Sequence, residues 1–315
     1  MHMEHLEGLI AAPFTPMKDD GTLNTGLIPP YFEMLKANGV RGAFICGSTG
    51  EGVSMTTEEK KSVAEAWAAC TKGERAFKVI TLLGGTSLAE CKDLAQHAQR
   101  VGLYAVAFTA PFYFKPPDVE SLASACAEVG GVVPDMPFYY YHIPVLTGVG
   151  FPMLNLLQAL HGRMPNFAGV KYTHEDFMDY LSCLRFHHGQ YDMLWGRDEN
   201  WLAALVLGAR AAVGSTYNYA PALYIDITRA FEAGDLEKAR SLQQLSIDMI
   251  RLLGKYGGIA TGKAFMKLIG MNCGAFRLPV KNMSDEAFRF FKEDAERLGF
   301  RDFCAKLPAG HLVSG

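Results

Sequence analysis

A lysine ends a short apolar run that has the composition of a buried strand. Lys171 follows Phe167–Val170, and strand alternation places its side chain on the face of Gly169, opposite Ala168 and Val170. We expect Ala168 and Val170 to contact outer helices and Lys171 to face inward. Burial lowers the pKa of lysine and favours the neutral amine, which attacks ketones. The alternative is a lysine that snorkels from the strand end to water.

A tyrosine ends another predicted strand. Tyr141 is the last of three consecutive tyrosines, and a phenol at that position can relay protons to and from a carbinolamine and a substrate hydroxyl. Simple packing of an interior aromatic residue is the alternative for a run of this kind.

A glycine-rich turn joins a predicted strand to a helix. In Gly47-Ser48-Thr49-Gly50-Glu51, backbone N–H groups and the hydroxyls of Ser48 and Thr49 can hold an anion. Because no lysine follows the turn, a small carboxylate fits better than a nucleoside triphosphate. The alternative is an ordinary turn whose hydroxyls cap backbone groups.

Two acidic residues follow a third strand end. Asp198 and Glu199 could bind the hydroxyls of a polyol, and they could equally form the acidic first turn of a helix. The pair His187-His188 is expected at the solvated surface, and no H-x-H or H-E-x-x-H motif occurs. We therefore expect neither a metal nor a cofactor.

Eight short apolar runs alternate with helical patterns. Because parallel strands need crossover helices, this order predicts a parallel sheet, and eight units predict a (β/α)8 TIM barrel whose active site lies at the carboxyl ends of the strands. An open doubly wound sheet would place a glycine-rich turn after the first strand, where the sequence instead has Ala12–Pro16. The expected strands are Leu6–Ala11, Gly42–Cys46, Phe77–Leu83, Ala105–Thr109, Phe138–Tyr141, Phe167–Lys171, Asp192–Trp195 and Ala211–Val213.

Amphipathic helices continue beyond the eighth unit. We expect residues 1–233 to form the barrel and residues 234–315 a C-terminal helical extension packed on it, as one structural unit. A capping box at Thr56–Glu59 is expected to open the second helix. Further helices are expected at Thr57–Thr71, Leu88–Val101, Val119–Val129, Asp176–Phe186, Asp235–Leu253, Ala260–Ile269 and Ser284–Arg297.

The composition restricts the class of protein. The 315 residues are 49% apolar and carry a formal charge of −3, which predicts a large core and gives no basic stripe for nucleic acid. Seven cysteines form an odd set without C-x-x-C spacing, so disulfides are not expected. The residues from Met1 to His5 do not resemble a signal peptide, and no apolar stretch is long enough for a membrane span. These features predict a cytoplasmic location.

Taken together, the motifs resemble those of the N-acetylneuraminate lyase family, within the dihydrodipicolinate synthase-like class I aldolases. Gly47–Glu51, Tyr141-His142-Ile143-Pro144 and Gly169–Thr173 match the family motifs in order. The resemblance extends from about Leu6 to about Leu298.

The resemblance implies a role for each matching position. Lys171 is similar to the Schiff-base lysine and Tyr141 to the proton relay, while Ser48 and Thr49 match the pyruvate carboxylate site. The positions that match contacts to the sugar are Thr173, Gly196, Asp198, Glu199 and Ser215. Tyr113 is similar to the tyrosine that a neighbouring subunit inserts, and the family implies a homotetramer. The implied small molecules are sialic acid, pyruvate and N-acetylmannosamine, with no cofactor.

Three positions bear on the subgroup. Dihydrodipicolinate synthases carry an arginine after the tyrosine motif, where this sequence has Leu146, so a carboxylated aldehyde would lack its clamp. His142 and Phe44 depart from some relatives, and neither is expected to touch the Schiff-base chemistry. Aldol cleavage of another 2-keto-3-deoxy acid and a non-catalytic pyruvate-binding barrel remain the alternatives. Three other lysines, Lys115, Lys255 and Lys263, are expected in water.

Overall fold

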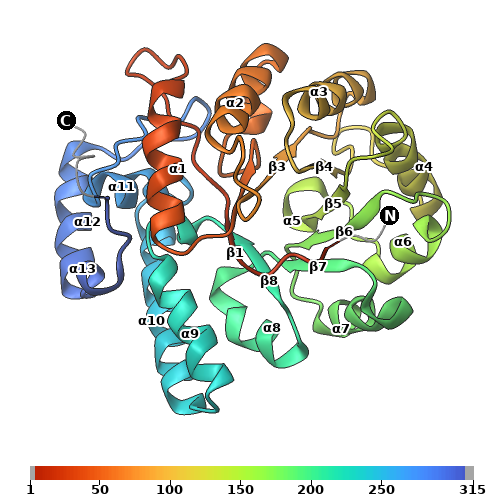
Figure 1. Ribbon diagram of the computed structural model, residues 1–315. Helices are drawn as coiled ribbons and strands as arrows, with labels where there is room; N and C mark the ends of the chain where they lie inside the picture. Colours follow the sequence, from red (N-terminus) through yellow and green to blue (C-terminus); the bar gives the residue numbers. More distant parts are fainter. Residues whose placement is uncertain (1–3, 309–315) are drawn as a thin grey trace.

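Eight parallel strands close into a barrel at the centre of the molecule (Figure 1). The computed structural model describes residues 4–308. The strands follow chain order around the barrel, and β1 pairs with β8 to close it, so the predicted TIM barrel is confirmed. The strands are β1 (Gly8–Ala11), β2 (Gly42–Ile45), β3 (Lys78–Leu82), β4 (Ala105–Thr109), β5 (Phe138–His142), β6 (Phe167–Tyr172), β7 (Asp192–Trp195) and β8 (Ala211–Gly214).

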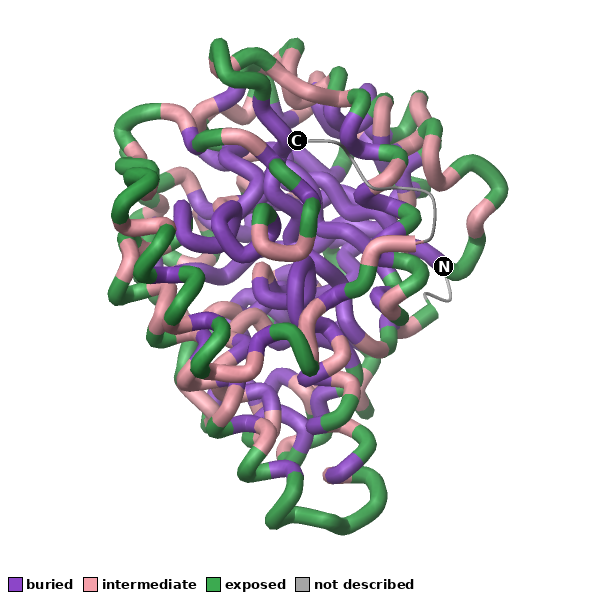
Figure 2. Tube along the Cα trace, turned by 90° about the vertical axis from the view of Figure 1, so that its left-hand side faces the viewer, coloured by how far each residue is buried: buried purple, intermediate pink, exposed green. Residues whose placement is uncertain are grey.

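Helices surround the strands, and buried residues concentrate in the middle of the molecule (Figure 2). One apolar layer fills the barrel and a second lies between the barrel and the helices. The outer helices are α1 (Ile28–Ala37), α2 (Thr57–Cys70), α3 (Leu88–Val101), α4 (Val119–Gly130), α5 (Pro144–Thr147), α6 (Met153–Leu160), α7 (Phe177–Arg185), α8 (Trp201–Leu207) and α9 (Pro221–Glu232), with short 3-10 turns η1 (Thr25–Leu27), η2 (Gly52–Ser54), η3 (Phe186–Gly189), η4 (Asp198–Asn200) and η5 (Thr216–Asn218).

Local interactions decide where the elements begin and end. β1 starts at Gly8, two residues later than expected, because the Leu6 N–H donates to the Asp192 carboxylate at 3.3 Å. β2 ends before Cys46, whose φ of 57° is incompatible with a strand. The capping box is confirmed, since the Thr56 hydroxyl accepts from the Glu59 N–H at 3.2 Å and the Glu59 carboxylate accepts from the Thr56 N–H at 2.9 Å.

A β-bulge in β6 alters the predicted alternation. Phe138 pairs with Phe167 and Tyr139 pairs with Gly169, so Ala168 is the extra residue between them. Val170 and Lys171 face outward and inward as predicted, but Ala168 belongs to the interior apolar layer. The prediction that Ala168 contacts the outer helices is therefore wrong, because the bulge restarts the alternation.

The helices after the barrel lie beside it and pack against α9 (Figure 1). They are α10 (Leu236–Lys255), α11 (Ala260–Leu268), α12 (Asp285–Arg297) and α13 (Phe300–Phe303). The predicted division after residue 233 falls between α9 and α10, and residues 309–315 of the predicted extension, like Met1–Met3, lie outside the described residues.

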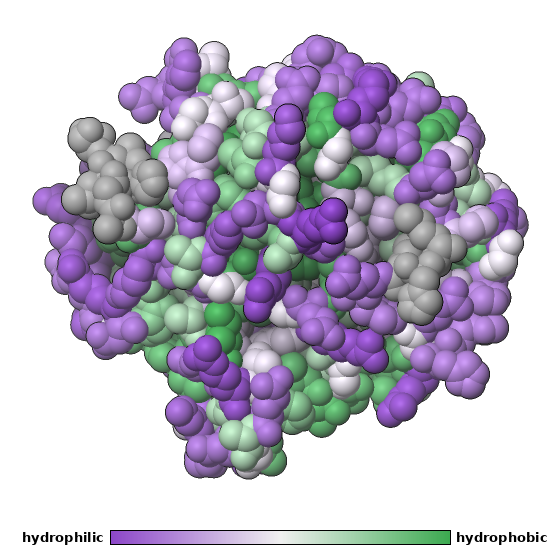
Figure 3. Space-filling view, viewed as in Figure 1, coloured by the Kyte–Doolittle hydropathy of each residue, from purple (hydrophilic) through white to green (hydrophobic). Residues whose placement is uncertain are grey.

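The face of the molecule seen in Figure 3 is mostly hydrophilic. On the face in Figure 3, hydrophilic side chains cover most of the rim, with hydrophobic ones visible between them. His187 and His188 are exposed, as expected. Within residues 4–308, no helix is both long and apolar enough to cross a membrane.

Candidate active site

Lys171 lies inside the barrel at the carboxyl end of β6, with a side chain only 4% exposed. It pairs in register with Tyr141 of β5, and its Nζ lies 4.0 Å from the centre of the Tyr141 ring. None of the ion pairs found within residues 4–308 includes Lys171. The snorkelling alternative is therefore wrong, because the amine is enclosed by aromatic rings.

Phe44 forms the other side of this enclosure. Its ring centre lies 4.2 Å from Lys171 Nζ, and its ring packs edge-on against Tyr141 at 5.5 Å. The expectation that Phe44 stays away from the lysine chemistry is wrong. The reason is that Phe44 faces inward on β2 and spans the barrel, a contact that residue spacing does not reveal.

Tyr141 is held in place by its own strand neighbours. The residue is 4% exposed, and its carbonyl accepts a hydrogen bond of 3.0 Å from the Thr109 hydroxyl of β4. A phenol next to an amine at the mouth of a barrel can exchange protons with groups attached to that amine.

The Gly47–Glu51 turn follows β2 on the same end of the barrel. The turn is closed by hydrogen bonds from Glu51 N–H to Ser48 carbonyl at 3.2 Å and from Gly52 N–H to Gly47 carbonyl at 3.1 Å. Ser48 is half-buried and Thr49 is 8% exposed. Glu51 adopts a φ of 59°, a left-handed conformation that is uncommon for residues with a Cβ atom.

Thr173 and Gly196 lie against each other beyond the ends of β6 and β7. A Cβ atom on Gly196 would fall 2.0 Å from the Thr173 hydroxyl, so only glycine leaves room for it. That hydroxyl is buried and has no hydrogen-bond partner among the described residues. Its capacity to form a hydrogen bond is therefore unused within residues 4–308.

The carboxylate of Asp198 points to the outer side of β8. One oxygen accepts from the Thr216 N–H at 3.1 Å and hydroxyl at 2.6 Å, and the other lies where a Cβ of Gly214 would stand. Burial raises the pKa of Asp198 to about 6. The carboxylate thus braces the ends of β7 and β8.

Glu199 and Ser215 lie nearer the surface. Glu199 belongs to η4 and forms an ion pair of 2.8 Å with Arg197, while Ser215 is half-buried and accepts from the Asn218 amide through its carbonyl. The structure thus brings Lys171, Tyr141 and Thr173 to one end of the barrel. Contacts of Asp198, Glu199 and Ser215 with a sugar stay predictions.

His142 is buried on the outer side of β5, among Tyr140, Tyr172 and His174. Burial, reinforced by the charge of His174, lowers the pKa of His142 to about 3. The ring is therefore neutral at physiological pH. It faces away from Lys171, in agreement with the expectation that it takes no part in the lysine chemistry.

The remaining lysines differ from one another. Lys115 and Lys255 are exposed as expected, but Lys263 is 5% exposed and pairs with Glu51 at 2.8 Å. Its predicted exposure is wrong, because its partner lies 212 positions away in the sequence. The run Gly262–Met266, apolar apart from the lysine, was the available signal for burial.

An aromatic loop after β4 and the short helix α5 after β5 both carry exposed apolar side chains. Tyr113 is 79% and Phe114 87% exposed, and Leu146 of α5 is 62% exposed. Within the single chain, Tyr113 therefore projects into solvent.

Known proteins match this arrangement over almost the whole chain. Residues 5–297 match the dihydrodipicolinate synthetase family. An N-acetylneuraminate lyase of Pongo abelii is 39% identical over 98% of both chains. The Proteus mirabilis N-acetylneuraminate lyase structure superposes with a TM-score of 0.91 at 37% identity, over 94% of this chain and 100% of the other. For the Aliivibrio salmonicida N-acetylneuraminate lyase (sialic acid aldolase), the TM-score is 0.91 and the identity 36%, over 95% and 98% of the two chains. This chain therefore belongs to the dihydrodipicolinate synthetase family, within its N-acetylneuraminate lyase group.

Proposed function

We propose that this protein is a class I aldolase that splits N-acetylneuraminate reversibly into pyruvate and N-acetylmannosamine through a Schiff base on Lys171. The observation that carries the proposal is the buried amine of Lys171, enclosed by the rings of Phe44 and Tyr141 at the carboxyl end of the barrel. An amine that is kept from water and from carboxylates is suited to nucleophilic attack on a ketone.

The first half of the reaction forms the iminium. The carboxylate of open-chain sialic acid binds at Ser48 and Thr49, which brings its C2 ketone toward Lys171. The neutral amine adds to C2, and loss of water from the carbinolamine gives a positively charged iminium. Tyr141, whose ring lies against the amine, relays the protons of this step.

The second half breaks the C3–C4 bond. Tyr141 accepts the C4 hydroxyl proton as its own proton passes to the substrate carboxylate, and the bonding electrons move into the iminium to give an enamine. The free hydroxyl of Thr173 orients the C4 hydroxyl. N-acetylmannosamine leaves, and the enamine is protonated at C3 and hydrolysed to pyruvate. Lysine itself supplies the electron sink, so the reaction requires no cofactor or metal.

The sugar end of the substrate lies toward β7 and β8 in this proposal. Gly196, Asp198, Glu199 and Ser215 follow those strands, and the Asp198 carboxylate supports the site from behind through Thr216. Leu146 in place of an arginine favours a neutral aldehyde over a carboxylated one. Another 2-keto-3-deoxy acid as substrate and a non-catalytic pyruvate-binding barrel are the less favoured alternatives.

We also propose a cytoplasmic homotetramer. All seven cysteines are free thiols, which fits a reducing compartment. The exposed Phe112, Tyr113 and Phe114 form an apolar loop of the kind that a subunit interface covers, and Tyr113 would then approach a neighbouring active site. Sedimentation of an active monomer would contradict the tetramer.

Trapping with pyruvate and borohydride tests the mechanism. Reduction should inactivate the enzyme and label Lys171, and Lys171→Met should lose turnover by several orders of magnitude, while Lys115→Met, a change at an exposed lysine, should leave it unchanged. Pyruvate release should be fastest with N-acetylneuraminate in a panel of sialic and keto-deoxy acids, and a chelator should not slow it. Labelling of another lysine, or faster synthesis of dihydrodipicolinate, would exclude this function.

A further inference from the structure

The carboxylate of Glu51, at the end of the Gly47–Glu51 turn, is buried and held by the C-terminal extension. The side chains of Glu51 and Lys263 are 3% and 4% exposed, and Lys263 Nζ lies 2.8 Å from Glu51 Oε1. The other carboxylate oxygen, Oε2, accepts a 2.8 Å hydrogen bond from the Arg277 backbone N–H. Both oxygens therefore bind residues that come after the barrel in the sequence.

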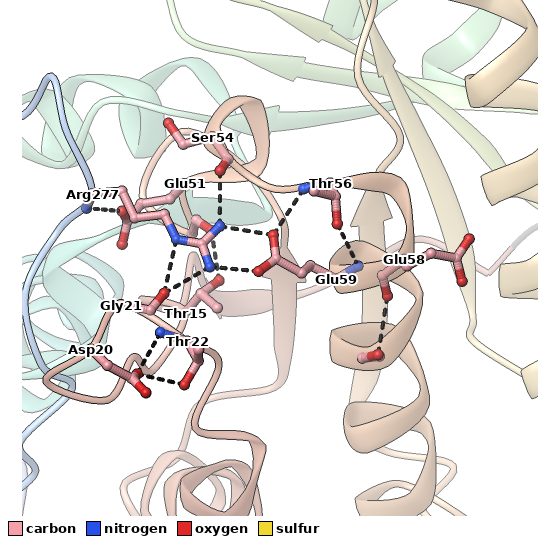
Figure 4. A network of polar contacts seen from close by, with 12 residues as sticks. Thr15, Asp20, Gly21, Thr22, Glu51, Ser54, Thr56, Glu58, Glu59 and Arg277 are labelled. Carbon is pink, nitrogen blue, oxygen red and sulfur yellow. Dashed lines mark hydrogen bonds and ion pairs between the residues drawn. The ribbon is translucent and has the colours of Figure 1, made fainter.

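The partners of Glu51 are themselves fixed. Lys263 also donates to the Ala275 carbonyl at 2.9 Å. The Arg277 guanidinium donates to the carbonyls of Gly21 and Ser54 and forms two hydrogen bonds with Glu59 of α2, as Figure 4 shows. The same contact with Arg277 lowers the pKa of Glu59 to about 2. Residues of the C-terminal extension thus contact Glu51 at the end of the turn and also Ser54 and Glu59, which follow it in the sequence.

The conformation of the turn depends on such an anchor. Glu51 is left-handed at a φ of 59°, a conformation that persists in residues other than glycine only when the surroundings impose it. Its N–H closes the turn on the Ser48 carbonyl. A shift of Glu51 would therefore move Ser48 and Thr49, which carry the proposed carboxylate site.

We propose that Lys263 is a positioning residue that holds Glu51, and through it Ser48 and Thr49, in the geometry that binds the substrate carboxylate. This inference rests on the proposed function for the identity of the ligand. Lys263 touches no reacting atom, so its removal should weaken carboxylate binding more than it slows the bound complex.

Lys263→Met removes the anchor with little change in bulk. We expect about a tenfold rise in the KM for N-acetylneuraminate and in the Kd for pyruvate, the latter measured by titration calorimetry, because a lost charged hydrogen bond is worth about one decade in affinity. The kcat should stay within about twofold of the wild-type value, since Lys263 touches no reacting atom. Lys255→Met is the matched control, since it breaks an ion pair with Asp294 inside the extension. Its KM and Kd should stay at the wild-type values.

Three outcomes decide against the proposal. If Lys263→Met lowers kcat and leaves KM and Kd unchanged, Lys263 is only structural. Should that variant not fold, Glu51→Gln/Lys263→Met removes both buried charges together, and wild-type KM and Kd in the double variant would refute the anchor. Failure of the function itself is recognised separately, because the wild type would then bind pyruvate without borohydride labelling of Lys171. Absence of pyruvate binding by the wild type would overturn both ideas.

Discussion

Replacing His142 with asparagine should make the protein less sensitive to acid. The pKa of His142 is lowered to about 3 in the folded protein, against about 6.5 in an unfolded chain. Between these two values the unfolded chain binds a proton that the folded protein does not bind, so acidification favours unfolding. The contribution of neutral His142 to the free energy of unfolding is therefore fully present above pH 6.5, and it is lost as the pH falls toward 3.

The size of this effect follows from the two pKa values. At pH 5, which lies about 1.5 units below the pKa of histidine in the unfolded chain, protonation of this residue stabilises the unfolded chain by about 2 kcal/mol. At pH 7 the same contribution is close to zero. The groups that face His142 are the rings of Tyr140, Tyr172 and His174, and the charge of Asp176 opposes the shift only weakly.

Urea unfolding followed by tryptophan fluorescence at pH 7 and pH 5 measures this difference. Wild type should lose about 2 kcal/mol more unfolding free energy than His142→Asn between the two pH values. His188→Asn is the control, because His188 is exposed and has a φ of 57°, which asparagine tolerates; it should show the wild-type pH dependence. Equal pH dependence in wild type and His142→Asn would refute the assigned protonation.

Two further substitutions test residues that follow the end of β7. Gly196→Ala would place a Cβ atom 2.0 Å from the Thr173 hydroxyl, and displacement of that group by about 1 Å should lower kcat/KM for N-acetylneuraminate by about 100-fold; unchanged initial rates in a folded variant would contradict the role of Thr173. Asp198, with a pKa raised to about 6, contributes stability in its protonated form that is lost as pH rises through 6. Asp198→Asn should therefore gain about 2.4 kcal/mol relative to wild type between pH 4 and pH 8, and a pH-independent difference in urea unfolding would disprove it.

Local patterns were sufficient to predict the barrel and the end of it at which the proposed site residues lie together. The eight strands are short apolar runs separated by helical periodicity, and Lys171, Tyr141 and Gly47–Glu51 each follow such a run. Parallel strands bring their carboxyl ends together, so three motifs far apart in the sequence could be placed at one site without knowledge of any contact.

The features that the sequence analysis missed depend on pairing between distant segments. Ala168 faces inward because β6 is bulged relative to β5, and a bulge is a property of two strands together. Phe44 contacts Lys171 across the barrel. Lys263 is buried because Glu51 offers it a charge 212 positions away. The contacts themselves have no signature in the spacing of neighbouring residues, although the apolar run around Lys263 indicated that this lysine is buried.

The extension supports the proposed site at two places. On one side, Lys263 and the Arg277 N–H hold Glu51 next to the carboxylate turn. On the other, Gln243 of α10 donates to the Asp198 carbonyl at 3.3 Å, beside the strand ends proposed to face the sugar. A chain ending after α9 would therefore lose supports at both ends of the proposed substrate. The extension is part of the proposed active-site architecture, because it fixes the loops at those two ends while Lys171 and Tyr141 are fixed by the barrel strands themselves.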